Sequence, residues 1–187
     1  MNFKTSPAAL PEVLLVEFGR IQDERGFFAE TYKEKDFAAL GLPRFVQDNA
    51  SRSAQGILRG LHYQLNPAAQ GKLVRCTRGR VFDAAVDIRK DSPRWGKWAA
   101  VELSEDKPLM IYVPPGFAHG FLALTDGAEV LYKTTAYYSP EHERCLLWND
   151  PAVGVPWPIR EPALSPRDAR APLLKDAETN FEFAFPL

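Results

Sequence analysis

The chain of 187 residues carries 23 Lys and Arg residues against 24 Asp and Glu residues, so its net charge is only −1. A charge so close to zero argues against a general nucleic-acid binder or membrane-surface binder. With 45% hydrophobic and 25% charged residues, the composition is typical of a soluble globular protein, and the length fits one domain over residues 1–187.

The N-terminal residues and the cysteines bear on where the protein works. Residues 1–5 lack the long apolar core of a signal peptide, and no apolar run is long enough to span a bilayer. The two cysteines, Cys76 and Cys145, are too few for a disulfide framework. We therefore expect a cytoplasmic protein with reduced thiols.

Short β-strands at close intervals dominate the chain, and 16 prolines against 12 glycines favour stiff loops over long helices. The expected strands span residues 12–18, 27–32, 57–64, 72–77, 80–89, 97–103, 109–113, 119–124 and 129–138. Arg78-Gly79 fits a two-residue hairpin turn between the fourth and fifth of them. So many short strands favour an all-β sandwich or jelly roll.

Helices are expected to be few and short. The stretch from Thr31 to Glu34 has capping-box spacing and leads into a helix over residues 35–40, which Gly41 stops. A second short helix is expected to begin at Ser165-Pro166, and residues 177–187 are expected to form a loosely held tail. In the strand over residues 80–89, one face is apolar and the other, with Asp83 and Asp87, is mostly charged.

His62 is the first of only three histidines and stands between apolar neighbours in the stretch Leu58–Gln64. A histidine in a cavity is the natural candidate for a base working near neutral pH. In an apolar strand, however, a histidine is more often a hydrogen-bonded core residue. The residue alone leaves both readings open.

The pattern Pro115-x-x-x-His119 resembles the second motif of the cupin barrels. The first cupin motif needs a second histidine two positions after the first, and here that position holds Gln64. Lys72 follows where a further ligand would be needed, and a cation is electrostatically wrong beside a divalent ion. We therefore expect a cupin-like fold without a metal.

Two other candidates also have competing structural readings. Tyr132 shares a strand face with Val130 and Thr134, which is typical of an aromatic core stripe but also allows a general acid. Asp168 stands where an acidic residue favours a helix N-terminus after Ser165-Pro166, and taken alone this role is the better one. No glycine-rich phosphate loop is present, so side chains must hold any phosphate.

Seven ordered motifs carry a resemblance that no single motif could carry. They are Asp23–Glu30, Phe45–Asn49, Leu58–Gln64, Gln70–Arg75, Val81–Arg89, Pro114–Phe121 and Tyr132–Tyr138. In this order they resemble the dTDP-4-dehydrorhamnose 3,5-epimerase family over residues 10–176. The resemblance covers nearly the whole chain.

The resemblance implies a cupin-like jelly roll with a few short helices that forms a homodimer. It implies cofactor-independent epimerisation of dTDP-4-dehydro-6-deoxy-D-glucose at C3 and C5, giving dTDP-4-dehydro-L-rhamnose for dTDP-rhamnose and cell-surface polysaccharide. By motif position, His62 would be the base, Asp168 its orienting partner and Tyr132 the acid, with Lys72 beside the ketone oxygen. The implied substrate-binding residues are Arg25, Glu30, Gln47, Asp48, Asn49, Arg59, Lys72, His119, Tyr138, Glu143 and Arg167, with Tyr138 stacking on thymine.

Two residues fit this picture with difficulty. The family commonly has lysine where this chain has Arg167, and a planar guanidinium does not have the geometry of a point charge. Arg59 and His62 have opposite strand parity, so they can share a cavity only if a bulge lies at Gly60; otherwise Arg59 serves a site elsewhere, such as one across a dimer interface.

Three other functions remain open on the sequence. A relative could invert only one of the two carbons or isomerise a related keto sugar. A metal-dependent cupin would need an ion at His62 and His119. A non-catalytic sugar-binding module would have no need for the full acid–base set.

Overall fold

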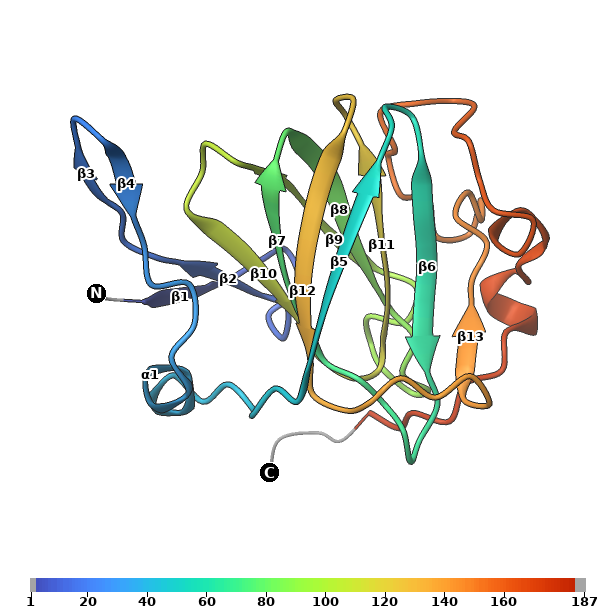
Figure 1. The fold of residues 1–187 in the computed structure, drawn as a ribbon. Coiled ribbons are helices and arrows are strands. Elements are labelled where there is room, and N and C mark those ends of the chain that lie inside the picture. The colour runs from blue at the N-terminus through green and yellow to red at the C-terminus, as the bar shows by residue number, and fades with distance from the viewer. Residues whose placement is uncertain (1–2, 184–187) are drawn as a thin grey trace.

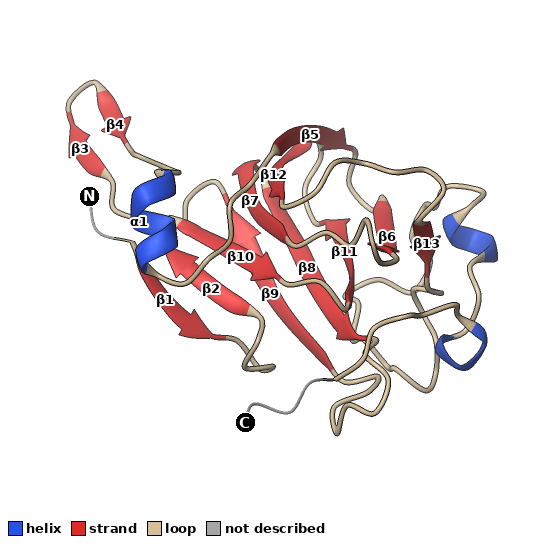
Figure 2. Ribbon diagram, turned by 90° about the horizontal axis from the view of Figure 1, so that it is seen from below, coloured by secondary structure: helices blue, strands red, loops and turns tan. Residues whose placement is uncertain are grey.

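The computed structural model describes residues 3–183, most of whose strands form two antiparallel sheets that pack face to face (Figures 1 and 2). The six-stranded sheet has the order β1 (Lys4–Pro7), β2 (Leu14–Glu17), β10 (Leu109–Val113), β7 (Lys72–Arg78), β12 (Ala128–Thr134) and β5 (Gln47–Ser53). The five-stranded sheet has the order β13 (Glu143–Cys145), β6 (Leu58–Gln64), β11 (Phe117–Ala123), β8 (Arg80–Asp87) and β9 (Trp98–Ser104). The expected all-β jelly-roll architecture is confirmed.

The space between the sheets is apolar at one end and polar at the other. At the apolar end, Val74, Ile111 and Val130 of the six-stranded sheet pack against Val81 and Phe121 of the five-stranded sheet. The charged face expected for residues 80–89 is not a solvent face, because Asp83 and Asp87 are both fully buried. That strand instead has apolar contacts on both sides and brings carboxylates into the interior.

The expected hairpin at Arg78-Gly79 is wrong, because β7 and β8 belong to different sheets. The chain crosses from one sheet to the other at Gly79, which has a φ of 69°. A Cβ there would lie only 2.2 Å from the hydroxyl of Thr125, so the crossing requires glycine. The sequence pattern of two strands around a glycine does not distinguish a hairpin from a crossover between layers.

The one α-helix, among the described residues, is α1 (Glu34–Ala39). Its N-cap residue is Lys33 with no side-chain hydrogen bond, so the expected capping box is wrong. Packing holds the helix instead, since Phe37 is 1% exposed and contacts the rings of Phe3 and Tyr32. The later helical turns are the 3-10 turns η1 (Asp168–Arg170) and η2 (Leu174–Asp176), and no helix of residues 3–183 is long and apolar enough to cross a membrane.

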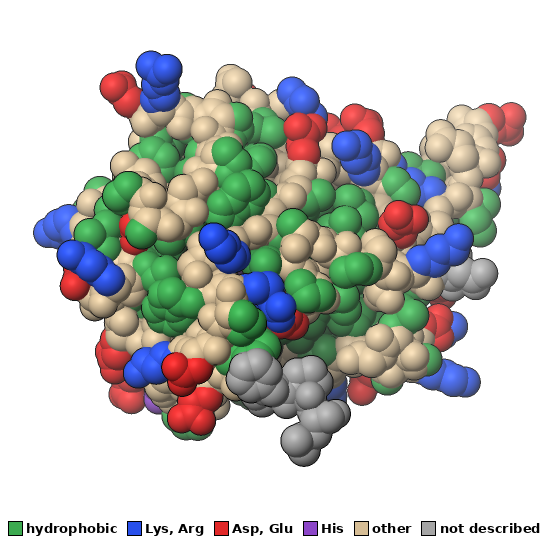
Figure 3. All heavy atoms as spheres, turned by 180° about the vertical axis from the view of Figure 1, so that it is seen from behind, with side chains coloured by type: hydrophobic (Ala, Val, Ile, Leu, Met, Phe, Trp, Pro, Cys, Tyr) green, Lys and Arg blue, Asp and Glu red, His purple; other side chains and the backbone are tan. Residues whose placement is uncertain are grey.

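A hairpin of β3 (Ile21–Asp23) and β4 (Gly26–Phe28) stands apart from both sheets. The strand expected over residues 27–32 is therefore shorter and begins earlier. Figures 1 and 2 show the hairpin projecting from the body, and it stands out as a lobe at the upper right of Figure 3. Ile21, Phe27 and Phe28 are each more than half exposed on it.

The segment 177–183 packs against the body, so the expectation of a loose tail is wrong for these residues. Asn66 and Asn180 exchange three hydrogen bonds of 3.0–3.1 Å through their side-chain amides and backbone groups. Phe181 is 6% exposed and packs edge-on against Tyr63. The rest of the expected tail, 184–187, lies outside the described residues.

A bulge interrupts β6 where it pairs with β11. His62 lies opposite His119, and Arg59 lies opposite Phe121, so the step of three residues on β6 faces a step of two on β11. Gly60 is the extra residue, and its φ of 120° is one that residues with a side chain rarely adopt. This one irregularity turns Arg59 and His62 to the same side of the sheet.

We expect Gly60→Ala to lower the free energy of unfolding by about 3 kcal/mol or more, because strain and backbone clash act together. A Cβ at Gly60 would lie 2.6 Å from the Gly120 Cα and 2.7 Å from the His119 carbonyl oxygen. Gly41→Ala is the matched control, since Gly41 also has a positive φ but nothing within 4 Å. Denaturant unfolding measures both, and equal losses would contradict the role of the close backbone approach.

Candidate active site

A cleft lies between the sheets and consists of two adjoining cavities. The larger has a volume of about 460 Å³ and the smaller about 120 Å³, and both are lined by His62, Lys72 and Tyr132. Most of the residues expected at the site line one or both cavities: Gln47, Asn49, Arg59, His62, Lys72, His119, Tyr132, Tyr138, Glu143, Arg167 and Asp168. The fold thus brings together residues that are up to 121 positions apart in the sequence, as Gln47 and Asp168 are.

His62 and Asp168 form a hydrogen-bonded pair at the larger cavity. The imidazole Nε2 lies 2.6 Å from Asp168 Oδ1, and the aspartate is 3% exposed. Burial raises the pKa of Asp168, but the hydrogen bond and the charge of His62 outweigh it and lower the pKa below its ordinary value. An ionised Asp168 fixes the imidazole orientation and leaves Nδ1 as the free ring nitrogen.

Asp168 was also a candidate for capping a helix N-terminus, but in the 165–168 turn Ser165 has that role. Ser165 Oγ accepts a hydrogen bond from the backbone N–H of Asp168 at 3.1 Å, so serine caps the turn. The Asp168 carboxylate is therefore available to His62.

Tyr132 reaches the cleft from β12, in the sheet opposite to the one that carries His62. Burial raises the pKa of its phenol, so Tyr132 keeps its proton at neutral pH. An imidazole on one wall and a protonated phenol on the other could act as a base and an acid on opposite sides of a ring bound between them. Tyr132 is therefore not only a packed core residue, because it lines both cavities.

Lys72 is a cation between the two walls. It starts from β7 in the six-stranded sheet, and its Nζ donates a hydrogen bond of 3.3 Å to the backbone oxygen of His62 in the other sheet. Desolvation lowers the pKa of Lys72 to about 8, partly offset by the charges of Glu143 and Asp83. At neutral pH the amine is therefore still mostly charged, and it is poorly hydrated.

A second cluster of polar side chains, Tyr138, Glu143 and Arg167, lies at the smaller cavity. The Tyr138 hydroxyl donates a hydrogen bond of 2.7 Å to Glu143, and the same carboxylate pairs with Arg167. Burial raises the pKa of Glu143, but the hydrogen bonds from Arg167 and Tyr138 lower it below its ordinary value. The Tyr138 ring is 53% exposed, which leaves its face open to a planar ligand.

A family model described as dTDP-4-dehydrorhamnose 3,5-epimerase matches residues 7–176. The chain belongs to the dTDP-4-dehydrorhamnose 3,5-epimerase family. It is 52% identical over 172 residues to the enzyme of that name from Salmonella typhimurium, covering 90% of this chain and 94% of the relative. It is 50% identical over 178 residues to the Pseudomonas aeruginosa enzyme of the same name, covering 94% and 98%.

The fold agrees with this family as well. The crystal structure of dTDP-6-deoxy-D-glucose-3,5-epimerase from Legionella pneumophila, in complex with dTDP-4-keto-L-rhamnose, superposes with a TM-score of 0.90. The two chains are 45% identical, and the match covers 94% of each.

The bulge at Gly60 resolves the conflict over Arg59 in this member of the family. Arg59 lines the larger cavity together with His62, as a bulge requires, and its own chain supplies it. Its Nε donates to the Ser53 hydroxyl at 3.0 Å, and a terminal nitrogen donates to the Arg52 carbonyl at 3.3 Å. These contacts hold a fixed positive charge at the cleft wall.

Asp83 lies behind the cleft-lining His119, a placement that the sequence did not reveal. Its carboxylate is fully buried and lies 2.9 and 3.0 Å from His119 Nε2. The cleft thus holds two histidines, each with a buried aspartate. The alternation in β8 did mark Asp83, but an alternating charged face is also what a solvent-exposed strand shows.

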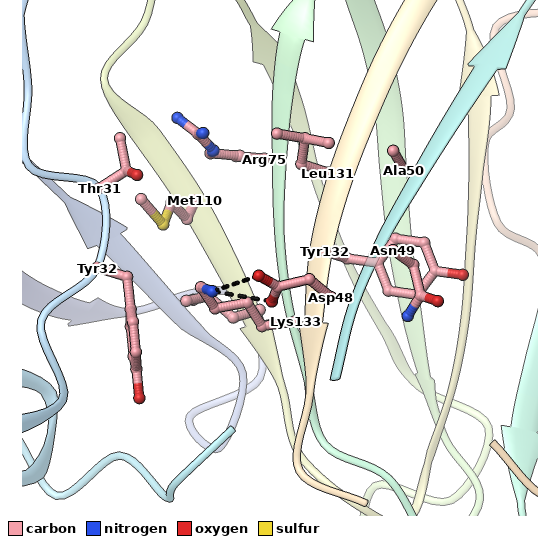
Figure 4. Close-up of a pocket in the computed structure, with 11 residues that line it drawn as sticks. Thr31, Tyr32, Asp48, Asn49, Ala50, Arg75, Met110, Leu131, Tyr132 and Lys133 are labelled. Atoms are coloured by element: carbon pink, nitrogen blue, oxygen red, sulfur yellow. Dashed lines mark hydrogen bonds and ion pairs between the residues drawn. The ribbon is translucent and has the colours of Figure 1, made fainter. Parts of the chain in front are cut away.

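Three expected binding residues do not line the cleft of their own chain: Arg25, Glu30 and Asp48. Arg25 lies on the projecting hairpin, with 84% of its side chain exposed, and pairs with Asp23. Asp48 points to the outer face of β5, where Lys133 donates hydrogen bonds of 2.8 and 3.0 Å to it. Figure 4 shows this pair beside Tyr32 in an outer groove of about 490 Å³, with the Tyr132 ring directed away from it.

We expect kcat/KM of the free enzyme to fall above about pH 8, because Lys72 loses its charge as pH rises through the pKa of about 8. The cation is present below that pH, so the loss lies on the alkaline side. Lys72→Arg should move this limb to higher pH, since a guanidinium stays charged. Initial rates from about pH 6 to about pH 10 measure this alkaline fall in kcat/KM. If the fall occurs at the same pH in Lys72→Arg, it does not arise from Lys72.

Proposed function

We propose that this protein converts dTDP-4-dehydro-6-deoxy-D-glucose to dTDP-4-dehydro-L-rhamnose by proton transfer at C3 and C5. The observation that carries the proposal is the opposed pair in the cleft: His62 with buried Asp168 on one sheet and protonated Tyr132 on the other. An inversion at carbon needs one group to remove a proton and another to return it from the opposite face.

The substrate explains why one histidine serves two carbons. C3 and C5 both flank the C4 ketone, so the same carbonyl acidifies both protons. In a gluco-configured chair these two C–H bonds are axial on one face of the ring. A single base beneath the ring can therefore reach both, and His62 Nδ1 is the nitrogen that Asp168 leaves free.

Lys72 stabilises the intermediate. Removal of either proton places negative charge on the C4 oxygen, giving an enolate. A fixed, poorly hydrated cation interacts more strongly with that enolate than with the neutral ketone, which lowers the barrier. Tyr132 then delivers a proton from the other wall. No hydride leaves the substrate, so this reaction requires no nicotinamide.

The nucleotide is held at the other end of the cleft. Tyr138 stacks on thymine, and Arg59 and Arg167 make charge-assisted contacts with the diphosphate. These contacts hold the sugar over His62. His119, Gln47, Asn49 and Glu143 complete the binding set in this proposal.

The active unit is a homodimer in which the partner's hairpin completes each cleft. Arg25 and Glu30 do not line their own chain's cleft, and the hairpin that carries Arg25 exposes Ile21, Phe27 and Phe28. A two-stranded hairpin is only marginally stable in isolation, and a second copy would cover these apolar side chains. A cytoplasmic location stays a prediction; both cysteines are free thiols, as a reducing compartment favours.

We expect the enzyme in D2O, with no added cofactor, to place deuterium at both C3 and C5 of the sugar. NMR of the recovered dTDP-sugar measures the label at each carbon. Label at one carbon alone would make the protein a mono-epimerase, and label at neither would favour a binding module. A bound ion whose removal stops the exchange would favour the metal-dependent cupin.

His62→Ala should lose this exchange by about a thousandfold or more, because the base is absent. Binding of dTDP measured by calorimetry should persist, which separates lost chemistry from lost folding. Full exchange activity in the variant contradicts the central role of His62.

Mixed subunits test the dimer. Arg25→Ala and His62→Ala chains should each be nearly inactive alone, but random mixing should restore about a quarter of wild-type activity if each cleft takes Arg25 from its partner. Half of the dimers would then be mixed, with one complete cleft in each. No recovery on mixing would mean that Arg25 serves its own chain or no cleft at all.

A further inference from the structure

Residues 136–139, which carry the exposed ring of Tyr138, continue the chain beyond β12 without a strand partner. Three glutamine side chains satisfy the backbone there. Gln70 Nε2 donates to the Ala136 oxygen at 2.7 Å, and Gln47 Oε1 accepts from the Tyr138 N–H at 2.9 Å. Gln64 makes the remaining two contacts, one on each side of Tyr138.

Gln64 uses its whole amide in this arrangement. Its Oε1 accepts a hydrogen bond of 2.8 Å from the Ser139 N–H, and its Nε2 donates to the Tyr137 oxygen at 3.2 Å. The same nitrogen donates to the Ala68 oxygen at 2.6 Å, which ties in the loop before Lys72. Because the side chain is 4% exposed, water cannot replace these bonds.

We propose that Gln64 is a positioning residue, which holds Tyr138 as the platform for the nucleobase and links it to His62. Gln64 lies two residues after His62 on β6, so both side chains are on the same strand face. The hydrogen bonds to Tyr137 and Ser139 fix the backbone on both sides of Tyr138, and Glu143 fixes its hydroxyl. The inference rests on the proposed function, because a platform matters only if a nucleotide binds there.

The chemistry of the position selects an amide. A carboxylate could accept from the Ser139 N–H but would face the carbonyl oxygens of Tyr137 and Ala68 with no proton to donate. A methionine would fill the same space and donate nothing. At the position where a metal-binding cupin has a metal ligand, this chain has a residue that positions the binding site for the nucleobase.

Gln64→Met should raise KM and the dissociation constant of dTDP about tenfold, the range expected from losing an aromatic stacking contact with a base. We expect kcat to stay within about threefold, because the platform is remote from the reacting carbons. Gln55→Met is the matched control, since Gln55 is exposed, donates only to the Leu124 oxygen and does not line the cleft. Initial rates and calorimetry with dTDP measure these values.

A double variant tests whether Gln64 acts through Tyr138. In a Tyr138→Ala background, Gln64→Met should weaken dTDP binding by no more than about twofold further, since the platform is already gone. Multiplying effects, unchanged dTDP binding in Gln64→Met, or a loss confined to kcat would each overturn the positioning role. Should Gln64→Met fail to fold, Gln64→Glu keeps the acceptor, and it should weaken dTDP binding in the same way.

The two levels of proposal fail differently. If the wild-type protein exchanges deuterium but Gln64→Met binds dTDP normally, only the positioning role is lost. If the wild-type protein neither exchanges deuterium nor binds dTDP, the proposed function is lost first.

Discussion

The bulge at Gly60 is the backbone constraint on which the cleft depends. In a regular strand, Arg59 and His62 would point to opposite faces, and one of the two would leave the interior. The extra residue restores a common direction, and it requires glycine both for its φ of 120° and for the close approach of Gly120. In this position His62 forms a hydrogen bond with Asp168, which is 106 residues away in sequence. The bond holds the 165–168 turn beside the cavity.

Charge burial gives the cleft its chemistry. Lys72, Asp83 and Asp168 all lie in or beside an interior that would normally exclude them, and each has a partner of opposite charge or a hydrogen bond nearby. The pKa directions of Lys72 and Asp168 follow from this competition. Burial alone lowers the pKa of Lys72, whereas the imidazole keeps Asp168 ionised despite its burial. A cation that is short of water is well suited to stabilise an enolate.

The two ends of the cleft are built by different means. The end proposed for proton transfer stands on paired strands of both sheets, which place His62 opposite His119 and Tyr132 opposite Val74. The end proposed for the nucleotide stands on residues 136–139, where side-chain amides replace the strand ladder. Strand pairing suits proton transfer, which depends on distance, and a side-chain scaffold lets an exposed ring present its face.

Much of the protein followed from the sequence alone. Period-two alternation and turn residues give the all-β architecture, and seven ordered motifs identify the family and nominate His62, Lys72, Tyr132 and Asp168. These features are local or linear, so a sequence can display them. The tertiary structure alone shows that β7 and β8 lie in different sheets, that Asp83 is buried against His119, and that Arg25 lies outside its own cleft. Those facts depend on which strands pair and which face is covered, and long-range packing sets both.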